Sequence, residues 1–211
     1  METYTFTKKE EIAHAITHGI GALLSIAALV VLIVFSSLNG DTLQVISGIV
    51  FGTTMLFMYL SSTIVHSLPE GKWKDIFQIF DHSSIYLFIA GSYTPFLLVP
   101  LRGDIGWTLF GIIWGIAIAG VIFKVFFVKK FLVLSTLFYI LMGWLIIFVW
   151  KPLTNLMHGN GITLLVIGGI FYTVGAIFYM WRSFPYHHAV WHLFVIAGSA
   201  FHFFAIFYYV I

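Results

Sequence analysis

Seven runs of roughly 20 apolar residues follow one another along this chain of 211 residues, separated by short polar connectors. Each run is long enough for a helix that crosses the hydrocarbon core of a bilayer, about 30 Å thick. The sequence therefore predicts an all-α membrane protein, a seven-transmembrane-helix bundle, in which consecutive helices are antiparallel. No connector is long enough for a second domain, so residues 1–211 are expected to form one transmembrane domain. The predicted spans are about His18–Leu38, Leu43–His66, Ile79–Pro100, Trp107–Phe127, Phe131–Trp150, Ile162–Arg182 and Ala189–Val210.

The composition agrees with this and restricts the available chemistry. Only 9% of the residues are charged, against about 25% in a soluble domain. There is no cysteine, which excludes disulfides and thiolate metal ligands. The nine histidines outnumber the eight acidic residues, so histidine is the main source of chemistry. The net charge of +2 and the absence of a basic run argue against nucleic acid, and membrane lipids are the expected partners.

The distribution of Lys and Arg predicts the orientation in the membrane, because short cytoplasmic loops are enriched in both. With seven spans, only Arg102 and Lys151 lie on the side opposite the N-terminus. The N-terminus should therefore be cytoplasmic and the C-terminus outside. The residues on the N-terminal side are Lys8, Lys9, Lys72, Lys74, Lys124, Lys129, Lys130 and Arg182.

Polar residues from three predicted spans should meet near the cytoplasmic end of the bundle. His188 and His192 are four residues apart and share one face of a helix, a spacing that suits two ligands of one metal ion. His66 ends the second span and Asp81 lies in the first turn of the third, so both reach a similar depth. Ser62 precedes His66 by one turn and faces the same way. Spacing alone leaves a metal site and ordinary packing equally open.

The other histidines have simpler interpretations. Contacts with lipid headgroups are expected for His82, His158 and His187, and a helix-to-helix hydrogen bond for His202. Three residues near the start of the first span could equally line the metal cavity or face elsewhere: Glu11, His14 and His18. A kink is expected in the third span at Pro95, with Ser92 or Thr94 bonding the freed backbone groups.

Several of these segments together resemble the haemolysin III family, within the wider group of progestin and adiponectin receptors and alkaline ceramidases. The combination Ser-x3-His, Asp and His-x3-His is specific, whereas each part alone is weak. The segments that carry the resemblance are Glu11–Gly21, Ser62–His66, Phe80–Tyr86, Gly91–Pro95 and His188–His192 continuing to His202.

The resemblance implies a zinc ion held by His66, His188 and His192, with Ser62 and Asp81 positioning water or transferring protons. It implies a multi-pass protein of the bacterial plasma membrane that hydrolyses lipid amide or ester bonds and is linked to membrane-lipid homeostasis. Two alternatives remain: a non-catalytic zinc site in a membrane sensor or regulator, and a pore-forming haemolysin. The substrate and the oligomeric state are left undetermined.

Overall fold

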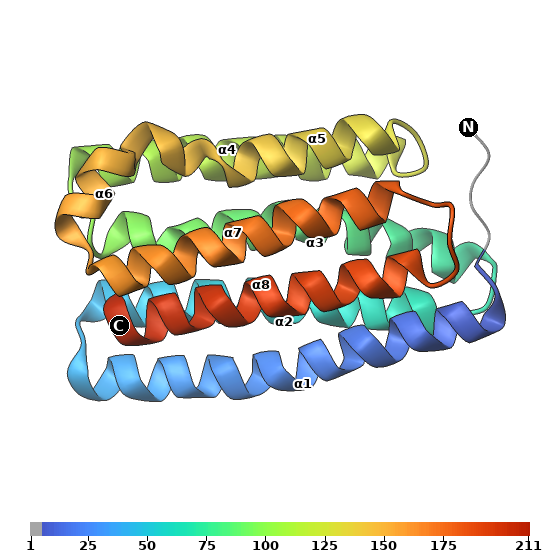
Figure 1. The fold of residues 1–211 in the computed structure, drawn as a ribbon, viewed down its shortest axis with the longest axis horizontal. Helices are drawn as coiled ribbons and strands as arrows, with labels where there is room; N and C mark the ends of the chain where they lie inside the picture. Colours follow the sequence, from blue (N-terminus) through green and yellow to red (C-terminus); the bar gives the residue numbers. More distant parts are fainter. Residues whose placement is uncertain (1–5) are drawn as a thin grey trace.

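The computed structural model describes residues 6–211, which fold into helices with no strand in that range (Figure 1). The first five residues of the predicted domain lie outside the described part. Within residues 6–211, six stretches are long and apolar enough to cross a membrane: Lys8–Asn39, Thr42–Ser67, Asp104–Phe127, Leu132–Leu156, Gly159–Met180 and His187–Tyr209. The elements are α1 (Lys8–Asn39), α2 (Thr42–Ser67), α3 (Lys72–Leu98), α4 (Asp104–Phe127), α5 (Leu132–Gly143), the 3-10 helix η1 (Leu145–Val149), α6 (Trp150–Leu156), α7 (Gly159–Met180) and α8 (His187–Tyr209).

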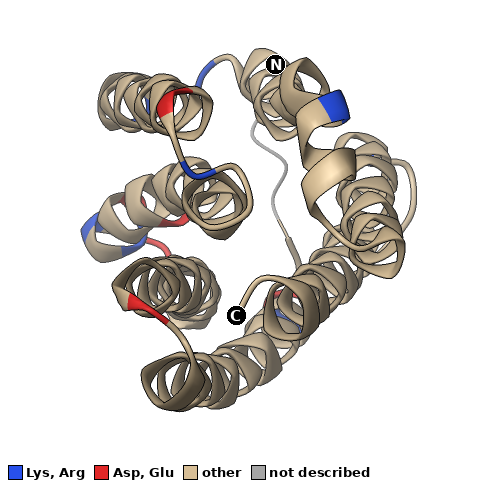
Figure 2. Ribbon diagram, turned by 90° about the vertical axis from the view of Figure 1, so that its left-hand side faces the viewer, with Lys and Arg blue, Asp and Glu red and all other residues tan. Residues whose placement is uncertain are grey.

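The long helices lie side by side along one axis, and neighbours in sequence pack together as α1 with α2, α2 with α3, α3 with α4 and α7 with α8. The first and last helices, α1 and α8, also touch, so helices from opposite ends of the sequence pack against each other. Figure 2 shows the helices nearly end-on, with charged residues at only a few places on the ribbon. The expected all-helical membrane architecture is confirmed.

Helix α1 begins at Lys8, well before the apolar run that predicted it. The Thr7 side chain accepts a hydrogen bond from the Glu10 amide, and the Glu10 carboxylate accepts one from the Thr7 amide. This capping box stabilises the first turn. It places Glu11 and His14 on a helix that continues into the membrane.

Helix α2 starts from Asp41, whose carboxylate accepts bonds from the amides of Leu43 and Gln44. Arg102, in the connector between α3 and α4, donates a hydrogen bond to the same carboxylate. This hydrogen bond holds the pKa of Asp41 below its usual range. The connector at this end of the bundle is thereby tied to the start of α2.

Helix α3 is more polar than the other long helices and falls outside the six candidates. It lies between α2 and α4, and every residue from Ala90 to Leu98 is buried. The helix continues through Pro95 to Leu98. The expected bonds to the freed carbonyl are wrong, because Ser92 donates to Ile89 and Thr94 to Ala90, each bonding its own preceding turn.

The predicted fifth span is interrupted within the bundle. Helix α5 ends at Gly143, and a 3-10 turn precedes α6. The Tyr93 hydroxyl on α3 donates to the Gly143 carbonyl at 2.6 Å and accepts a bond from the Ile146 amide at 2.9 Å. Backbone groups freed inside a membrane need such partners. Tyr93 therefore supports a break that the apolar run does not reveal.

Candidate metal centre

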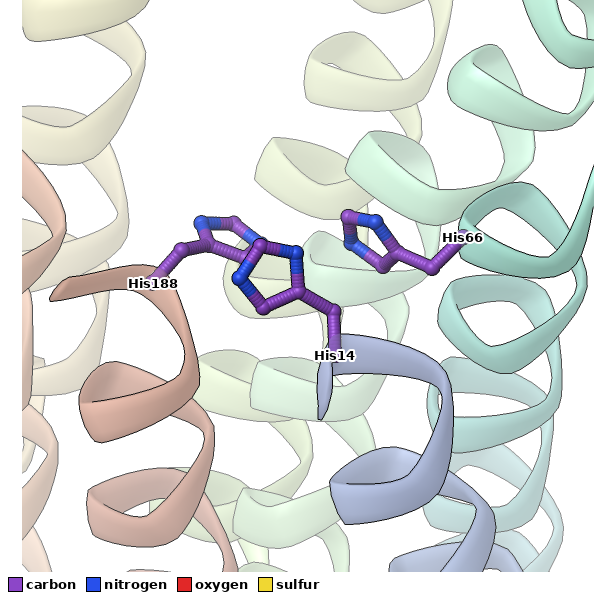
Figure 3. A group of neighbouring side chains, drawn as sticks. All are labelled: His14, His66 and His188. Carbon is purple, nitrogen blue, oxygen red and sulfur yellow. The ribbon is translucent and has the colours of Figure 1, made fainter. Parts of the chain in front are cut away.

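Four histidine side chains gather at the end of the bundle where α1 begins, on the right of Figure 1. His14 lies in the second turn of α1, His66 in the last turn of α2, and His188 and His192 in the first turns of α8. Because α2 runs opposite to α1 and α8, its C-terminal end meets their N-terminal ends. Figure 3 shows His14, His66 and His188 projecting towards one another from three helices.

The four imidazoles form a compact cluster. All six distances between ring centroids lie between 4.6 and 5.5 Å. One nitrogen each from His14, His66 and His188 lies within 4.8 Å of the other two, a group that could hold a metal ion. His192 lies outside this group of three nitrogens, although its ring centroid is 4.6 to 5.5 Å from those of the other three.

The nitrogens that face one another in this cluster have no other partner. The Nε2 atoms of His14, His66, His188 and His192 are all buried and make no hydrogen bond. A single buried polar atom left unsatisfied costs about 1–3 kcal/mol, so four together would be stabilised by one shared ligand. Imidazole nitrogens are ligands for zinc and for several other transition metals, and the donor set fits such an ion.

The opposite nitrogens of two rings are held by partners that favour metal binding. The Glu11 carboxylate lies 2.6 Å from Nδ1 of His66 and accepts a hydrogen bond from that N–H, which leaves the lone pair on Nε2. Thr17 Oγ1 lies 2.9 Å from Nδ1 of His192. Since the Thr17 hydroxyl donates to the Ala13 carbonyl, the ring N–H donates to Thr17 and Nε2 again carries the lone pair. Such outer partners fix the tautomer and orientation of a ligand histidine.

Two further residues of α1 complete the surroundings. Glu11 also accepts a hydrogen bond from Lys74 at 2.6 Å, so one carboxylate links α1, α2 and α3. The His18 ring stacks on His192 at a centroid distance of 3.4 Å. Neither nitrogen of His18 has a hydrogen-bond partner. The polar face of α1 therefore lies against the cluster over two turns.

Ser62 and Asp81 lie beside each other between α2 and α3, where the Ser62 hydroxyl interacts with the Asp81 carboxyl. Ser62 Oγ is buried and has no hydrogen-bond partner that meets normal geometry. Asp81 lies outside the group of ligand atoms that could hold a metal. The pair is therefore placed as a neighbour of the cluster and not within it.

For the remaining histidines, the structure confirms some of the expected contacts and contradicts others. His202 bonds from α8 to the Leu165 carbonyl on α7 at 3.2 Å, as expected. His82 and His187 are buried, so the expected headgroup contacts are wrong for both. His187 Nδ1 donates a hydrogen bond to the Phe178 carbonyl at 3.3 Å, and the His82 carbonyl accepts one from the Tyr139 hydroxyl. His158 is exposed and caps the start of α7.

His14 was expected either to line the metal cavity or to face elsewhere, and it was not among the metal ligands expected from the sequence. A signal was present in the pattern Thr7-x-x-Glu10, which is a capping box and begins a helix before the apolar run. Extending the helix to Lys8 puts Glu11, His14 and His18 on one face, at spacings of three and four residues. That face of α1 is the one that lies next to the C-terminal end of α2.

An apolar cavity of about 160 Å³ lies next to the cluster, between α3, α5, α7 and α8. Two rings of its lining, Trp191 and Tyr179, pack on His188 at centroid distances of 4.8 and 5.7 Å. His202 lines it further along α8. The break after Gly143 also contributes to the wall. Trp191 and Tyr179 therefore border both the cavity and the cluster.

The fold and the site together define a multi-pass integral membrane protein with a buried histidine cluster that could hold a metal ion. Residues 6–203 match the family described as Haemolysin-III related, and the chain belongs to this haemolysin III family. The family resemblance and the membrane location expected from the sequence are both confirmed, and the bacterial relatives support a bacterial plasma membrane.

Curated relatives cover nearly the whole chain. It is 55% identical to "Hemolysin-3 homolog" of Bacillus subtilis (strain 168), over 97% of this chain and 96% of the relative. It is 56% identical to "Hemolysin-3" of Bacillus cereus, over 96% and 93%. A human protein, "Monocyte to macrophage differentiation factor", is 31% identical over 96% of this chain and 85% of the relative.

Proposed function

We propose that this protein is a zinc-dependent membrane hydrolase that cleaves amide or ester bonds of lipids and so contributes to membrane-lipid homeostasis. The observation that carries the proposal is the set of four buried, unpartnered Nε2 atoms beside an apolar cavity within the bundle. A site for a metal and a space for an acyl chain are thereby adjacent.

The membrane arrangement that we propose has seven spans in one domain, with α3 as the span that composition does not select. At 1.5 Å per residue its 27 residues extend about 40 Å, more than the thickness of the hydrocarbon core. It packs between two candidate spans, α2 and α4, so its polar residues are shielded from lipid. Seven crossings put the termini on opposite sides. The excess of Lys and Arg at the end where α1 begins then favours a cytoplasmic N-terminus.

In this proposal the zinc ligands are His66, His188 and His192. When bound, zinc supplies Lewis acidity towards a carbonyl group and towards water. Glu11 and Thr17 hold two of the ligand rings in the tautomer that presents Nε2. Their role is to orient the donors before substrate arrives.

Asp81 and Ser62 are proposed to handle the proton and the carbonyl oxygen of the substrate. The partly buried carboxylate of Asp81 would take a proton from the attacking water and return it to the leaving group. The unpartnered Ser62 hydroxyl would donate a hydrogen bond to the developing oxyanion. Ser62 lies one turn further into the bundle than His66 on α2. Asp81 lies in the third turn of α3, which begins at Lys72 and packs against α2, and not in the first turn as expected from the sequence.

The substrate class follows from the cavity. Its lining is dominated by aromatic and aliphatic side chains, which suits a single acyl chain and excludes a charged group. An acyl chain in the cavity would bring its carbonyl carbon towards Trp191 and His188. The bond cleaved would therefore be the amide or ester at the head of that chain.

The test uses purified protein reconstituted in liposomes with N-acyl amide and ester lipids, with released fatty acid measured by mass spectrometry and zinc by elemental analysis. His192→Ala should lose at least about 100-fold in turnover, because a ligand and its share of the charge stabilisation are removed. His158→Ala, at the other end of the bundle, is the matched control and should retain turnover and zinc. Zinc-independent turnover, or none with any lipid tested, would contradict the proposal.

A second candidate function is a non-catalytic zinc centre that joins α1, α2 and α8 in a membrane sensor. The observation in its favour is that the cluster lies where the first and last helices of the chain meet. Zinc binding without turnover would support this candidate. Dye leakage from the same liposomes would instead support a pore, the reading suggested by the name of the Bacillus cereus relative.

A further inference from the structure

We propose that His14 is a fourth imidazole donor of the metal centre, supplied by α1, and that it occupies the coordination position that hydrolysis needs open. The inference rests on the proposed function in one respect, that the cluster binds a metal ion. It adds a regulatory element, since the site would be closed whenever His14 is bound and open when it is withdrawn.

The distances support His14 as a donor. Its ring centroid lies 4.8 Å from that of His66, 4.7 Å from that of His188 and 5.5 Å from that of His192. These values match the distances among the three proposed ligands, which are 4.6 to 5.5 Å. One nitrogen of His14 also belongs to the group of donor atoms within 4.8 Å of one another.

The hydrogen bonding of His14 leaves it available. The residue has no exposed surface, and neither ring nitrogen makes a hydrogen bond. Its Nδ1 lies 3.9 Å from a Glu11 carboxylate oxygen, which is too far for a hydrogen bond. An imidazole that served only for packing would be replaced at lower cost by an apolar ring, because both its polar atoms are buried without a partner.

The local structure holds His14 in this position. The capping box at Thr7 fixes the start of α1. The Phe6 ring packs edge-on against His14 at 4.6 Å and also contacts His188 at 5.1 Å. Phe6 therefore covers one side of the cluster. Movement of this short segment and the first turns of α1 would release His14 and admit water together.

The consequence for the metal is a choice between two coordination states. Four imidazoles complete a tetrahedral shell, whereas three leave one position for water or substrate. A four-nitrogen site would bind zinc tightly and be inactive. Withdrawal of His14 would convert it into the three-histidine site of the proposed hydrolase.

The experiment counts the nitrogen donors around zinc in the full-length protein by X-ray absorption and measures zinc affinity by competition with a chelator. Wild type should show four imidazole nitrogens. His14→Ala should show three nitrogens with a lighter oxygen donor, and its zinc affinity should fall at least about tenfold. Added imidazole should restore the fourth nitrogen in this variant. His14→Asn provides a second variant of similar polarity if the alanine variant does not fold.

The control is His82→Ala, which removes a buried histidine outside the cluster and should leave both measurements unchanged. Three nitrogens and one oxygen in wild type, unaltered in the His14 variants, would overturn the proposal. Failure of the hydrolase is recognised separately, because neither measurement uses turnover. Four nitrogens without any lipid cleavage would support His14 as a ligand and remove only the enzymatic function.

Discussion

Glu11 is the residue on which most of the polar contacts of the site converge. Its two carboxylate oxygens bond His66 and Lys74, each at 2.6 Å, so it connects three helices. It also fixes which nitrogen of His66 is free. A carboxylate that orients a ligand histidine raises the affinity for the metal without touching it.

Glu11→Gln tests this positioning role. The amide can accept one hydrogen bond but loses the charge that pairs with Lys74 and strengthens the bond to His66. Zinc affinity should fall about 10–100-fold, measured by chelator competition. Glu70→Gln is the matched control, since Glu70 also pairs with Lys74 at 2.9 Å but is exposed and does not contact His66. An equal loss in both variants would show that Lys74 pairing, and not the orientation of His66, is what matters.

At the scale of elements, the interrupted span from α5 to α6 differs most from an ordinary transmembrane helix. Tyr93 bonds backbone groups on both sides of the break, and the interrupted segment lines the apolar cavity. Irregular backbone at membrane depth is tolerated where it is buried in protein or borders a cavity. The break is therefore tolerated because it borders the cavity and because Tyr93 bonds the backbone groups that a regular helix would have bonded internally.

Tyr93→Phe tests the support of the break. The variant retains the ring but leaves the amide of Ile146 and the carbonyl of Gly143 without this partner. The free energy of unfolding should fall by about 1–3 kcal/mol, observed as a lower melting temperature in detergent. Tyr208→Phe, at an exposed position of α8, should have no effect. Equal stability of wild type and Tyr93→Phe would mean that water replaces the hydroxyl.

For the whole molecule, the cluster joins α1, α2 and α8, which come from the two ends of the chain. Zinc bound there would stabilise the folded bundle in proportion to its affinity, by about 4 kcal/mol at a free concentration 1,000 times the dissociation constant. Treatment with a chelator should therefore lower the melting temperature of wild type, and added zinc should restore it.

The control for the metal effect is His188→Ala, which should melt at the same temperature with and without chelator. A melting temperature of wild type that is unaffected by chelator would contradict metal binding at this cluster. This outcome does not depend on substrate, so it applies to the enzyme and to the sensor alike.

Local composition was sufficient to predict most of the architecture. Long apolar runs identified the helices that can cross the membrane, and the residues of Ser62–His66 and His188–His192 indicated the family. The helix-to-helix bond of His202 was also predicted, because a polar group deep in an apolar span needs a partner from a neighbour. These features depend on residues close together in the chain and on the surrounding lipid.

Other features were decided only by the tertiary structure. His14 joins the cluster because α1 begins early and packs against α2 and α8, contacts that no local pattern contains. α5 breaks where Tyr93 of another helix bonds its backbone, and His82 and His187 are buried by neighbouring helices rather than at the lipid headgroups. The apolar run of a helix indicates that the helix enters the membrane. Which faces of neighbouring helices meet depends on how their side chains pack, because lipid provides no hydrophobic driving force that would select one face over another.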